Sequence, residues 1–220
     1  WSVEHVDSFW RSIWDYFDVQ ADGAPTVAIA HPHDFADPGW FAGTRLNYAG
    51  HALRLGDDDS VALIIVDEAG GDRRVSRGEL HARVASVQAQ FVADGVQEGD
   101  RVVGCLPNGL EAVAAFLAAT SLGAVWSCCG PEIGAEATLQ RFRQIEPVLL
   151  VGVDGYVFGG KTYDRSDALA EIAEGLPTLL ARYVVRSAVQ PSMPEMHGFR
   201  DWDDIPPIAT SPTFVRLPFD

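Results

Sequence analysis

Between residues 61 and 153, short apolar runs alternate with longer stretches in which apolar residues recur at every third or fourth position. Runs of about four to eight apolar residues are typical of buried strands, whereas apolar residues at every third or fourth position indicate helices. Strands that alternate with helices through short joints predict an α/β fold, a mostly parallel sheet with helices on both faces. The strands expected from this pattern cover residues 61–68, 100–108, 124–129 and 147–153.

A turn signal follows the first of these runs. Gly70 and Gly71 separate "VALIIVDE" from "RRVS", which predicts a β-hairpin. Residues 76–79, "SRGE", then have the form of a capping box, in which Ser and Glu side chains satisfy two free N–H groups at a helix start. Gly95 is a natural residue to end this helix. Its expected apolar stripe is Leu80, Val84, Val87 and Phe91.

Further elements extend the predicted sheet. Residues 109–123 are apolar nearly all round, which predicts a buried helix. Residues 135–146 predict another helix. A last helix is expected at 164–183 and a last strand at 183–189. A Pro-rich loop is expected from 191 to 212.

The segment before this alternation, residues 1–58, is irregular and rich in aromatic side chains. Within it, "VDSFWRSIWDYFDV" predicts a short amphipathic helix with Asp7 or Ser8 as its N-cap. We expect residues 1–58 to wrap over a larger body, and residues 59–220 to form a first α/β subdomain that is cut short. The apolar positions of the expected helix are Phe9, Ile13, Trp14 and Phe17.

The composition limits the classes of partner. A chain of 220 residues that is 47% hydrophobic can bury a real core. Its net charge of −15 and lack of a basic run argue against binding to nucleic acid or to an anionic membrane surface. Because no apolar run approaches about 18 residues and no leader pattern opens the chain, we expect a cytoplasmic protein without a membrane span.

The cysteines and histidines give no sign of a metal or a disulfide framework. Cys105, Cys128 and Cys129 are odd in number and lie inside apolar runs, which favours a reducing compartment. Cys128 and Cys129, at the end of a predicted strand and without a His at useful spacing, are expected to be inert core thiols. His31 and His33 lack a third ligand at useful spacing, so we expect no metal site there.

Residues 155–162, "GYVFGGKT", match the phosphate-binding pattern G-x-x-x-x-G-K-[ST], and residues 61–68 have the form of its Mg²⁺-binding partner. A P-loop needs small residues that wrap a phosphate and a helix that begins at its lysine. Here the bulky "YVF" favours extended backbone, and the next helix caps lie later, at Asp164 or Ser166. A nucleotide hydrolase remains an alternative that loss of nucleotide binding on Lys161→Ala would test.

Three stretches resemble the N-terminal region of the acetoacetyl-CoA synthetases, within the acyl-adenylate-forming superfamily that also holds the acetyl-CoA synthetases. They are "WFAGTRLNYAGHALR", "GVQEGDRVVGCLPNGLEAVAAFLAATSLGAVWSCCGPEIG" and "RFRQIEPVLLVGVDGYVFGGKTYDR". The resemblance covers essentially the whole chain, and "WSCCGP" is closer to the acetoacetyl branch than to the superfamily at large.

The resemblance implies a two-step ligase that uses ATP, Mg²⁺ and coenzyme A. A short carboxylic acid, acetoacetate, becomes an acyl-adenylate, and the thiol of coenzyme A then displaces AMP. The family's ATP loop, its Mg²⁺-binding Glu, its ribose-binding Asp and its C-terminal Lys would all lie beyond residue 220. We therefore expect no catalytic residue, no metal ligand and no tightly bound cofactor in this piece, which needs the remainder of its own polypeptide for activity.

What the piece can contribute, by the same resemblance, is part of the coenzyme A site. Lys161 would meet a phosphate as a point charge, with Phe158 nearby as a stacking surface, although Lys161 can equally be a solvated surface charge. The full expected set is Cys129, Gly130, Pro131, Lys161 and, as a weaker candidate, Arg141.

Two alternatives to an acetoacetate ligase stay open beside the nucleotide hydrolase. One is a ligase for acetate or another short acid. The other is a non-catalytic module that binds coenzyme A or a partner. The gene beyond residue 220 distinguishes them, because a Gly/Ser/Thr-rich loop and a terminal Lys there indicate a ligase.

Overall fold

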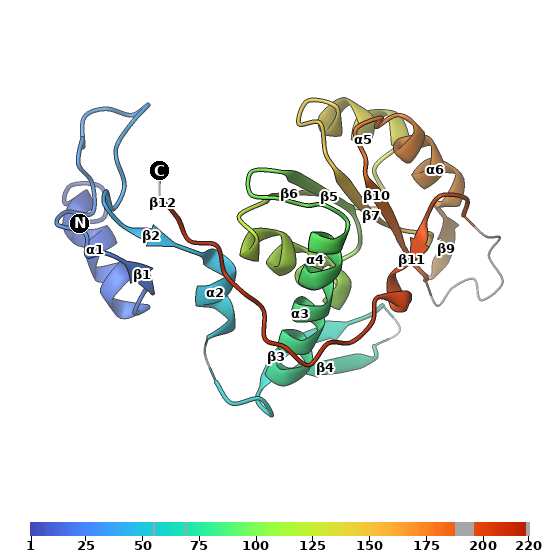
Figure 1. Cartoon of the computed structure of the whole chain (residues 1–220), viewed down its shortest axis with the longest axis horizontal. Coiled ribbons are helices and arrows are strands. Elements are labelled where there is room, and N and C mark those ends of the chain that lie inside the picture. Colours follow the sequence, from blue (N-terminus) through green and yellow to red (C-terminus); the bar gives the residue numbers. More distant parts are fainter. Residues whose placement is uncertain (55, 69, 188–195, 219–220) are drawn as a thin grey trace. The chain divides into compact units, whose positions relative to one another are not determined.

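The computed structural model describes residues 1–54, 56–68, 70–187 and 196–218 (Figure 1). The chain divides into two compact units. The first holds the N-terminal range together with residues 214–218, and the second holds the rest.

The second unit is built on a five-stranded sheet whose neighbouring strands are all parallel (Figure 1). The central strand is buried along its whole length, as expected when helices cover both faces of a parallel sheet. From one edge to the other, the strands are β11 (Arg200–Asp201), β10 (Ala181–Val185), β7 (Leu149–Val153), β5 (Arg101–Cys105) and β6 (Val125–Cys129).

Four helices cover this sheet: α3 (Arg77–Ala93), α4 (Leu110–Ser121), α5 (Ala135–Phe142) and α6 (Ser166–Glu174). The chain runs from β5 through α4 to β6, and then back past β5 through α5 to β7. Because such crossovers are right-handed, the two opposite directions put α4 and α5 on opposite faces. Helix α3 packs on α4 and α6 packs on α5, so both faces are covered and the predicted α/β fold is confirmed.

The main apolar core lies where α5 and α6 pack on the sheet. At one point α6 lies against bare backbone, because a β-carbon on Gly152 of β7 would lie 2.2 Å from Leu169 Cδ1. A side chain at position 152 would therefore push the helix away from the sheet. The most deeply buried members of this core include Phe142, Leu150, Leu169, Ile172, Leu176 and Val184.

Helix α3 follows the predicted pattern. Its four stripe residues are all buried, Ser76 Oγ accepts a hydrogen bond from the backbone N–H of Glu79 at 3.1 Å, and Gly95 follows the helix with φ +94°. The Glu79 carboxylate does not supply the second half of the capping box. It accepts instead from Arg73 Nη2 at 2.6 Å, on the hairpin that precedes the helix.

Two antiparallel hairpins flank the sheet. The expected one joins β3 (Val61–Val66) to β4 (Asp72–Ser76), and the other joins β8 (Gly155–Phe158) to β9 (Lys161–Asp164). Helix α6 is shorter than the predicted range 164–183, because Pro177 lacks the N–H that a continuing helix requires. Positions 188–189 of the expected last strand and 191–195 of the expected loop lie outside the described residues. The described part of that loop contains β11 and a 3₁₀ turn, η1 (Trp202–Asp204).

The first unit contains the predicted amphipathic helix as α1 (Val6–Tyr16), but its expected cap was wrong. The helix begins after His5, and the carboxylate of Asp7 accepts hydrogen bonds from the backbone N–H groups of Ala28 (2.7 Å) and Ile29 (3.2 Å). This carboxylate therefore anchors a loop. The other elements of the unit are β1 (Ala21–Asp22), β2 (Arg45–Leu46), α2 (Tyr48–Leu53) and β12 (Leu217–Pro218).

Strand β12 pairs with β2, so residues 214–218 belong to the first unit, although the expected boundary at residue 58 puts them in the second domain. Asn47 fixes the segment before β12, since its Nδ2 donates to the carbonyl of Val215 at 2.7 Å while its Oδ1 accepts from Gly50 N. Within the described ranges, no helix has both the length and the apolar character that crossing a bilayer requires.

Candidate ligand site at the carboxyl ends of the strands

The topology of the sheet creates a crevice at the carboxyl ends of two neighbouring strands. The connection after β5 leads to α4 on one face, and the connection after β7 leads to α6 on the other. Loops that diverge from adjacent parallel strands leave an opening between them, and open α/β sheets bind their ligands in this opening.

A groove of about 530 Å³ occupies this edge of the sheet. Its volume lies in the range of small-molecule sites, about 300–1,000 Å³. We call it the strand-end groove. It is lined by the loops after β5 and β6 and by strand β8, through Leu106, Pro107, Asn108, Gly130, Pro131, Glu132, Tyr156, Val157 and Phe158.

The three expected site residues at the end of β6 divide between the groove and the core. Gly130 and Pro131 line the groove, whereas Cys129 is buried and belongs to the core cluster beneath it. A β-carbon on Gly130 would lie 2.3 Å from a carboxylate oxygen of Glu132, so the turn after β6 folds tightly on itself. The loop therefore presents backbone and a rigid proline ring to the groove.

Arg141 lies on α5 and contacts Cys129, the last residue of β6. Its Nη1 is 3.7 Å from Cys129 Sγ, and its side chain is otherwise exposed. The structure thus brings two of the expected residues into contact with each other, although neither Arg141 nor Cys129 lines the strand-end groove.

The segment "GYVFGGKT" forms a β-hairpin and has no P-loop geometry. Strands β8 and β9 pair in register from Gly155 with Asp164 to Phe158 with Lys161, leaving Gly159 and Gly160 as a two-residue turn. Both glycines have positive φ, +58° and +68°, as such turns require. Helix α6 begins at Ser166, five positions after Lys161, so its N-terminus starts too late to hold a phosphate at this lysine.

Lys161 is exposed at the start of β9 and stands opposite Phe158, which lines the groove. It is also the single lysine of the sequence. Among the residues that the structure describes, no carboxylate forms an ion pair with it. Two positions further from the turn, Tyr156 and Tyr163 stack across the hairpin with ring centroids 5.1 Å apart, which stiffens the two strands.

Sequence reasoning missed a contact at the tip of this hairpin. The carboxylate of Glu68 accepts hydrogen bonds from the backbone N–H groups of Gly159 (3.0 Å) and Gly160 (3.1 Å). The pair Gly159–Gly160 between β-formers was itself a turn signal of the kind recognised at residues 70 and 71. The distant carboxylate had no local signal.

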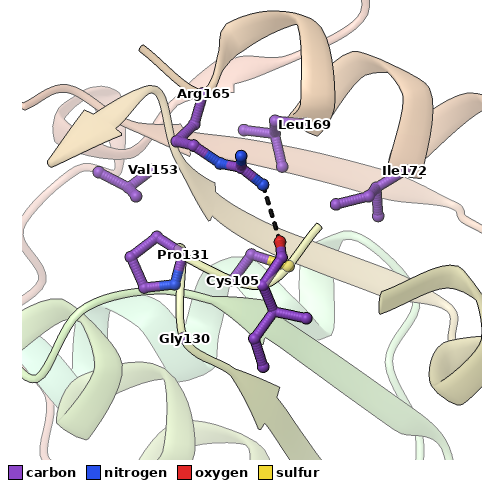
Figure 2. Close-up of a pocket in the computed structure, with 8 residues that line it drawn as sticks. Cys105, Gly130, Pro131, Val153, Arg165, Leu169 and Ile172 are labelled. Carbon is purple, nitrogen blue, oxygen red and sulfur yellow. Dashed lines mark hydrogen bonds between the residues drawn. The ribbon is translucent and has the colours of Figure 1, made fainter. Parts of the chain in front are cut away.

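A small cavity lies under the groove, between the sheet and α6 (Figure 2). The guanidinium of Arg165 reaches across it, and its Nη2 donates to the carbonyl of Ile133 at 2.8 Å. At about 10 Å³ the cavity has room for one water molecule at most. Burial raises the pKa of the Cys105 thiol in its wall to about 12, so this thiol stays protonated and unreactive.

A second groove of about 590 Å³ runs between β3 and α4, and most of its lining is apolar. Trp126 and Cys128 of β6 contribute to it. Cys128 is exposed and Cys129 is buried, so the prediction that both are core thiols was wrong for Cys128. The reason is the period of the strand: Cys128 and Cys129 are adjacent and point to opposite faces.

Within the described part of the chain, no three His, Cys, Asp or Glu side chains gather closely enough to hold a metal ion. His31 and His33 are exposed in the first unit.

Comparison with known proteins relates the chain to one enzyme family. Residues 54–212 match the AMP-binding enzyme family. An acetoacetyl-CoA synthetase from Macaca fascicularis is 40% identical over 181 residues, which are 81% of this chain and 27% of that protein. An acetoacetyl-coenzyme A synthetase from Rhizobium meliloti (strain 1021) is 35% identical over 223 residues, covering 100% of this chain and 34% of that protein.

A solved structure agrees with the fold. Acetoacetyl-CoA synthetase from Streptomyces lividans superimposes with a TM-score of 0.91 at 40% sequence identity, covering 100% of this chain and 34% of that one. A malonamoyl-CoA synthetase from Penicillium aethiopicum is 34% identical over 205 residues. The chain spans about a third or less of the length of these relatives.

Proposed function

The chain belongs to the AMP-binding enzyme family, and we propose that the protein is an ATP-dependent acid–thiol ligase that converts acetoacetate to acetoacetyl-CoA. In the first step, a carboxylate oxygen attacks the α-phosphorus of ATP and pyrophosphate leaves. In the second, the thiol sulfur of coenzyme A attacks the acyl carbon, loses its proton and displaces AMP. Relatives at 35–40% identity that carry this activity in their names support the proposal.

The contribution that we propose for these 220 residues is to bind the nucleotide end of coenzyme A in the strand-end groove. The observation that carries this proposal is the convergence of Gly130, Pro131 and Phe158 on one groove from two separate segments. Phe158 is 66% exposed, so its ring face is available to stack on an adenine. Its hairpin partner Lys161 supplies a cation for a phosphate.

Arg141 has a different role in this proposal. Its contact with Cys129 places a guanidinium next to the residue that precedes Gly130 and Pro131. We propose that it supports the shape of this turn and adds positive potential near the groove.

Calorimetric titration with coenzyme A tests the binding step. We expect Lys161→Ala to weaken binding roughly fivefold, as for an exposed charge–phosphate contact, and Phe158→Ala to weaken it about tenfold through lost stacking. Arg74→Ala is the matched control: it also removes one positive charge, but from an exposed residue on β4 outside the groove. Equal weakening by Arg74→Ala and Lys161→Ala would mean that only net charge matters.

The reaction itself is tested on the protein expressed from its whole gene. We propose that it requires Mg²⁺ with ATP and that it works in the cytoplasm, where ATP and coenzyme A are supplied. AMP release with acetoacetate, acetate and malonamate identifies the acid, since one relative is a malonamoyl-CoA synthetase. The 220 residues alone are proposed to be inactive, so ATP–pyrophosphate exchange by this chain would contradict the assignment of the ATP loop to a later segment.

A further inference from the structure

Arg165 connects two walls of the strand-end groove. One wall is strand β8, and the other is the loop after β6, residues 130–134. Arg165 directly follows β9 at the base of the β8–β9 hairpin, and its Nη2 donates to the carbonyl of Ile133 in the opposite loop at 2.8 Å (Figure 2). One side chain therefore joins two segments that are 32 residues apart. We call this hydrogen bond the tether.

The hairpin end of the tether is fixed to the sheet. The backbone N–H of Arg165 donates to the carbonyl of Asp154 at 2.7 Å, which closes the hairpin at its base. The Asp154 carboxylate is buried and accepts from the backbone N–H of Ser187, also at 2.7 Å. Asp154 follows β7 and Ser187 lies just beyond β10, so the base of the hairpin is held to the ends of two sheet strands.

The loop end of the tether is the last residue of a tight turn. The N–H of Ile133 donates to the Gly130 carbonyl at 3.2 Å, and the Ile133 carbonyl accepts from Arg165. A hydrogen bond from an ionised donor is roughly twice as strong as a neutral one. Within the described ranges, no carboxylate forms an ion pair with the half-buried Arg165, so its guanidinium is available to this carbonyl.

We propose that Arg165 is a positioning residue for the strand-end groove: it holds residues 130–134 at a fixed distance from the β8–β9 hairpin and so keeps the groove in its binding shape. The inference rests on the proposed binding of coenzyme A in this groove. Arg165 is not a ligand contact in this proposal, because it lines the small cavity beneath the groove rather than the groove. Without the tether, part of the binding free energy is used to order the loop.

Calorimetric titration with coenzyme A tests this role. Arg165→Met keeps an apolar stem in the cavity but removes the donor, and it should weaken binding about tenfold because the loop then adopts the binding shape only part of the time. Arg143→Met is the matched control. Arg143 Nε donates to the carbonyl of Gly175 at 3.0 Å, so this variant also loses an Arg–carbonyl hydrogen bond, but outside the groove. Equal weakening by the two variants would overturn the proposal.

Amide hydrogen exchange tests the tether without coenzyme A. The N–H of Ile133 should exchange roughly tenfold faster in Arg165→Met and at an unchanged rate in Arg143→Met. Failure of the unchanged chain to bind coenzyme A would overturn the proposed function, while faster exchange at Ile133 would still support the tether. Unchanged exchange in Arg165→Met would overturn the tether, since any loss of affinity would then reflect only the missing positive charge.

A free guanidinium ion provides a rescue experiment. Arg165→Ala leaves space for this ion beside the Ile133 carbonyl. Guanidinium chloride at a concentration that does not unfold the protein should restore part of the coenzyme A affinity and slow the exchange of the Ile133 amide. Sodium chloride at the same concentration controls for ionic strength and should do neither. An equal response to the two salts would contradict the tether.

Discussion

Tyr183 on β10 donates its phenolic hydrogen bond to the carboxylate of Asp94, the residue that follows α3. Arg200 completes the group, since its guanidinium pairs with Asp94 and also donates to the Tyr183 hydroxyl at 3.2 Å. Burial, together with the hydrogen bond to Asp94, raises the pKa of Tyr183 to about 12. The contact joins a helix end to two strands of the sheet.

This relationship predicts a loss of stability at alkaline pH. An unfolded tyrosine has a pKa of about 10, so the fold favours the protonated phenol. The stabilisation is fully present below about pH 10 and is lost as the pH rises through about 12. We expect the free energy of unfolding in urea to fall between these two pH values, and to fall less steeply in Tyr183→Phe.

Cys105 requires a control in this experiment, because burial also raises its pKa to about 12 and it contributes in an overlapping range. The comparison is therefore made in a Cys105→Ala background. An identical pH dependence with and without the Tyr183 hydroxyl would show that this phenol does not titrate with unfolding.

The three thiols should differ sharply in reactivity. Cys128 is exposed, whereas Cys105 and Cys129 are buried, so a disulfide reagent at pH 8 should label one thiol per chain quickly and the other two only on unfolding. Cys128→Ser should remove the fast phase. Two fast thiols in the folded chain would show that the end of β6 opens readily.

Gln88 connects α3 to Ser121 and to Thr213, which lie 33 and 125 positions further along the chain. Its Nε2 donates to Ser121 Oγ and to the carbonyl of Thr213, both at 2.6 Å, and its Oε1 accepts from Thr213 N at 2.9 Å. Gln88→Leu removes these three hydrogen bonds from a buried position and should cost about 1–3 kcal/mol in urea unfolding. The exposed Gln97→Ala is the control and should be neutral. A cost below about 0.5 kcal/mol for Gln88→Leu would show that water replaces the amide.

Gly152 sets the distance between β7 and α6. Gly152→Ala would place a β-carbon 2.2 Å from Leu169 Cδ1 and should destabilise the fold by about 1–3 kcal/mol through overpacking. Leu169→Ala removes the clash at the cost of a cavity, so the double variant should be more stable than the sum of the two single effects predicts. Additive effects would mean that the backbone, rather than Leu169, absorbs the change.

Much of the fold could be predicted because its signals are local. The apolar runs around Val102 and Leu150 identified buried strands, and the spacing of Leu80 to Phe91 identified a helix face. The order of the strands was not predictable in the same way. It depends on which helix covers which face, and no single segment carries that information.

The errors at the site have physical causes. Residues 155–162 match the spacing of a phosphate loop, but Gly159 and Gly160 within them are an ordinary hairpin turn between β-forming residues. Cys128 was misplaced although adjacent strand residues must face opposite sides. The contact between Glu68 and the hairpin tip joins positions about 90 residues apart, and only the folded chain brings them together.

The single lysine also makes the hairpin a unique point of cleavage. A protease specific for lysine has one peptide bond to cut in the sequence, between Lys161 and Thr162, next to an exposed turn. Cleavage there would separate residues 1–161 from 162–220 and divide the parallel sheet, with β5, β6 and β7 on one piece and β10 and β11 on the other. The rate of proteolysis at the Lys161–Thr162 bond therefore reports how often the β8–β9 hairpin opens.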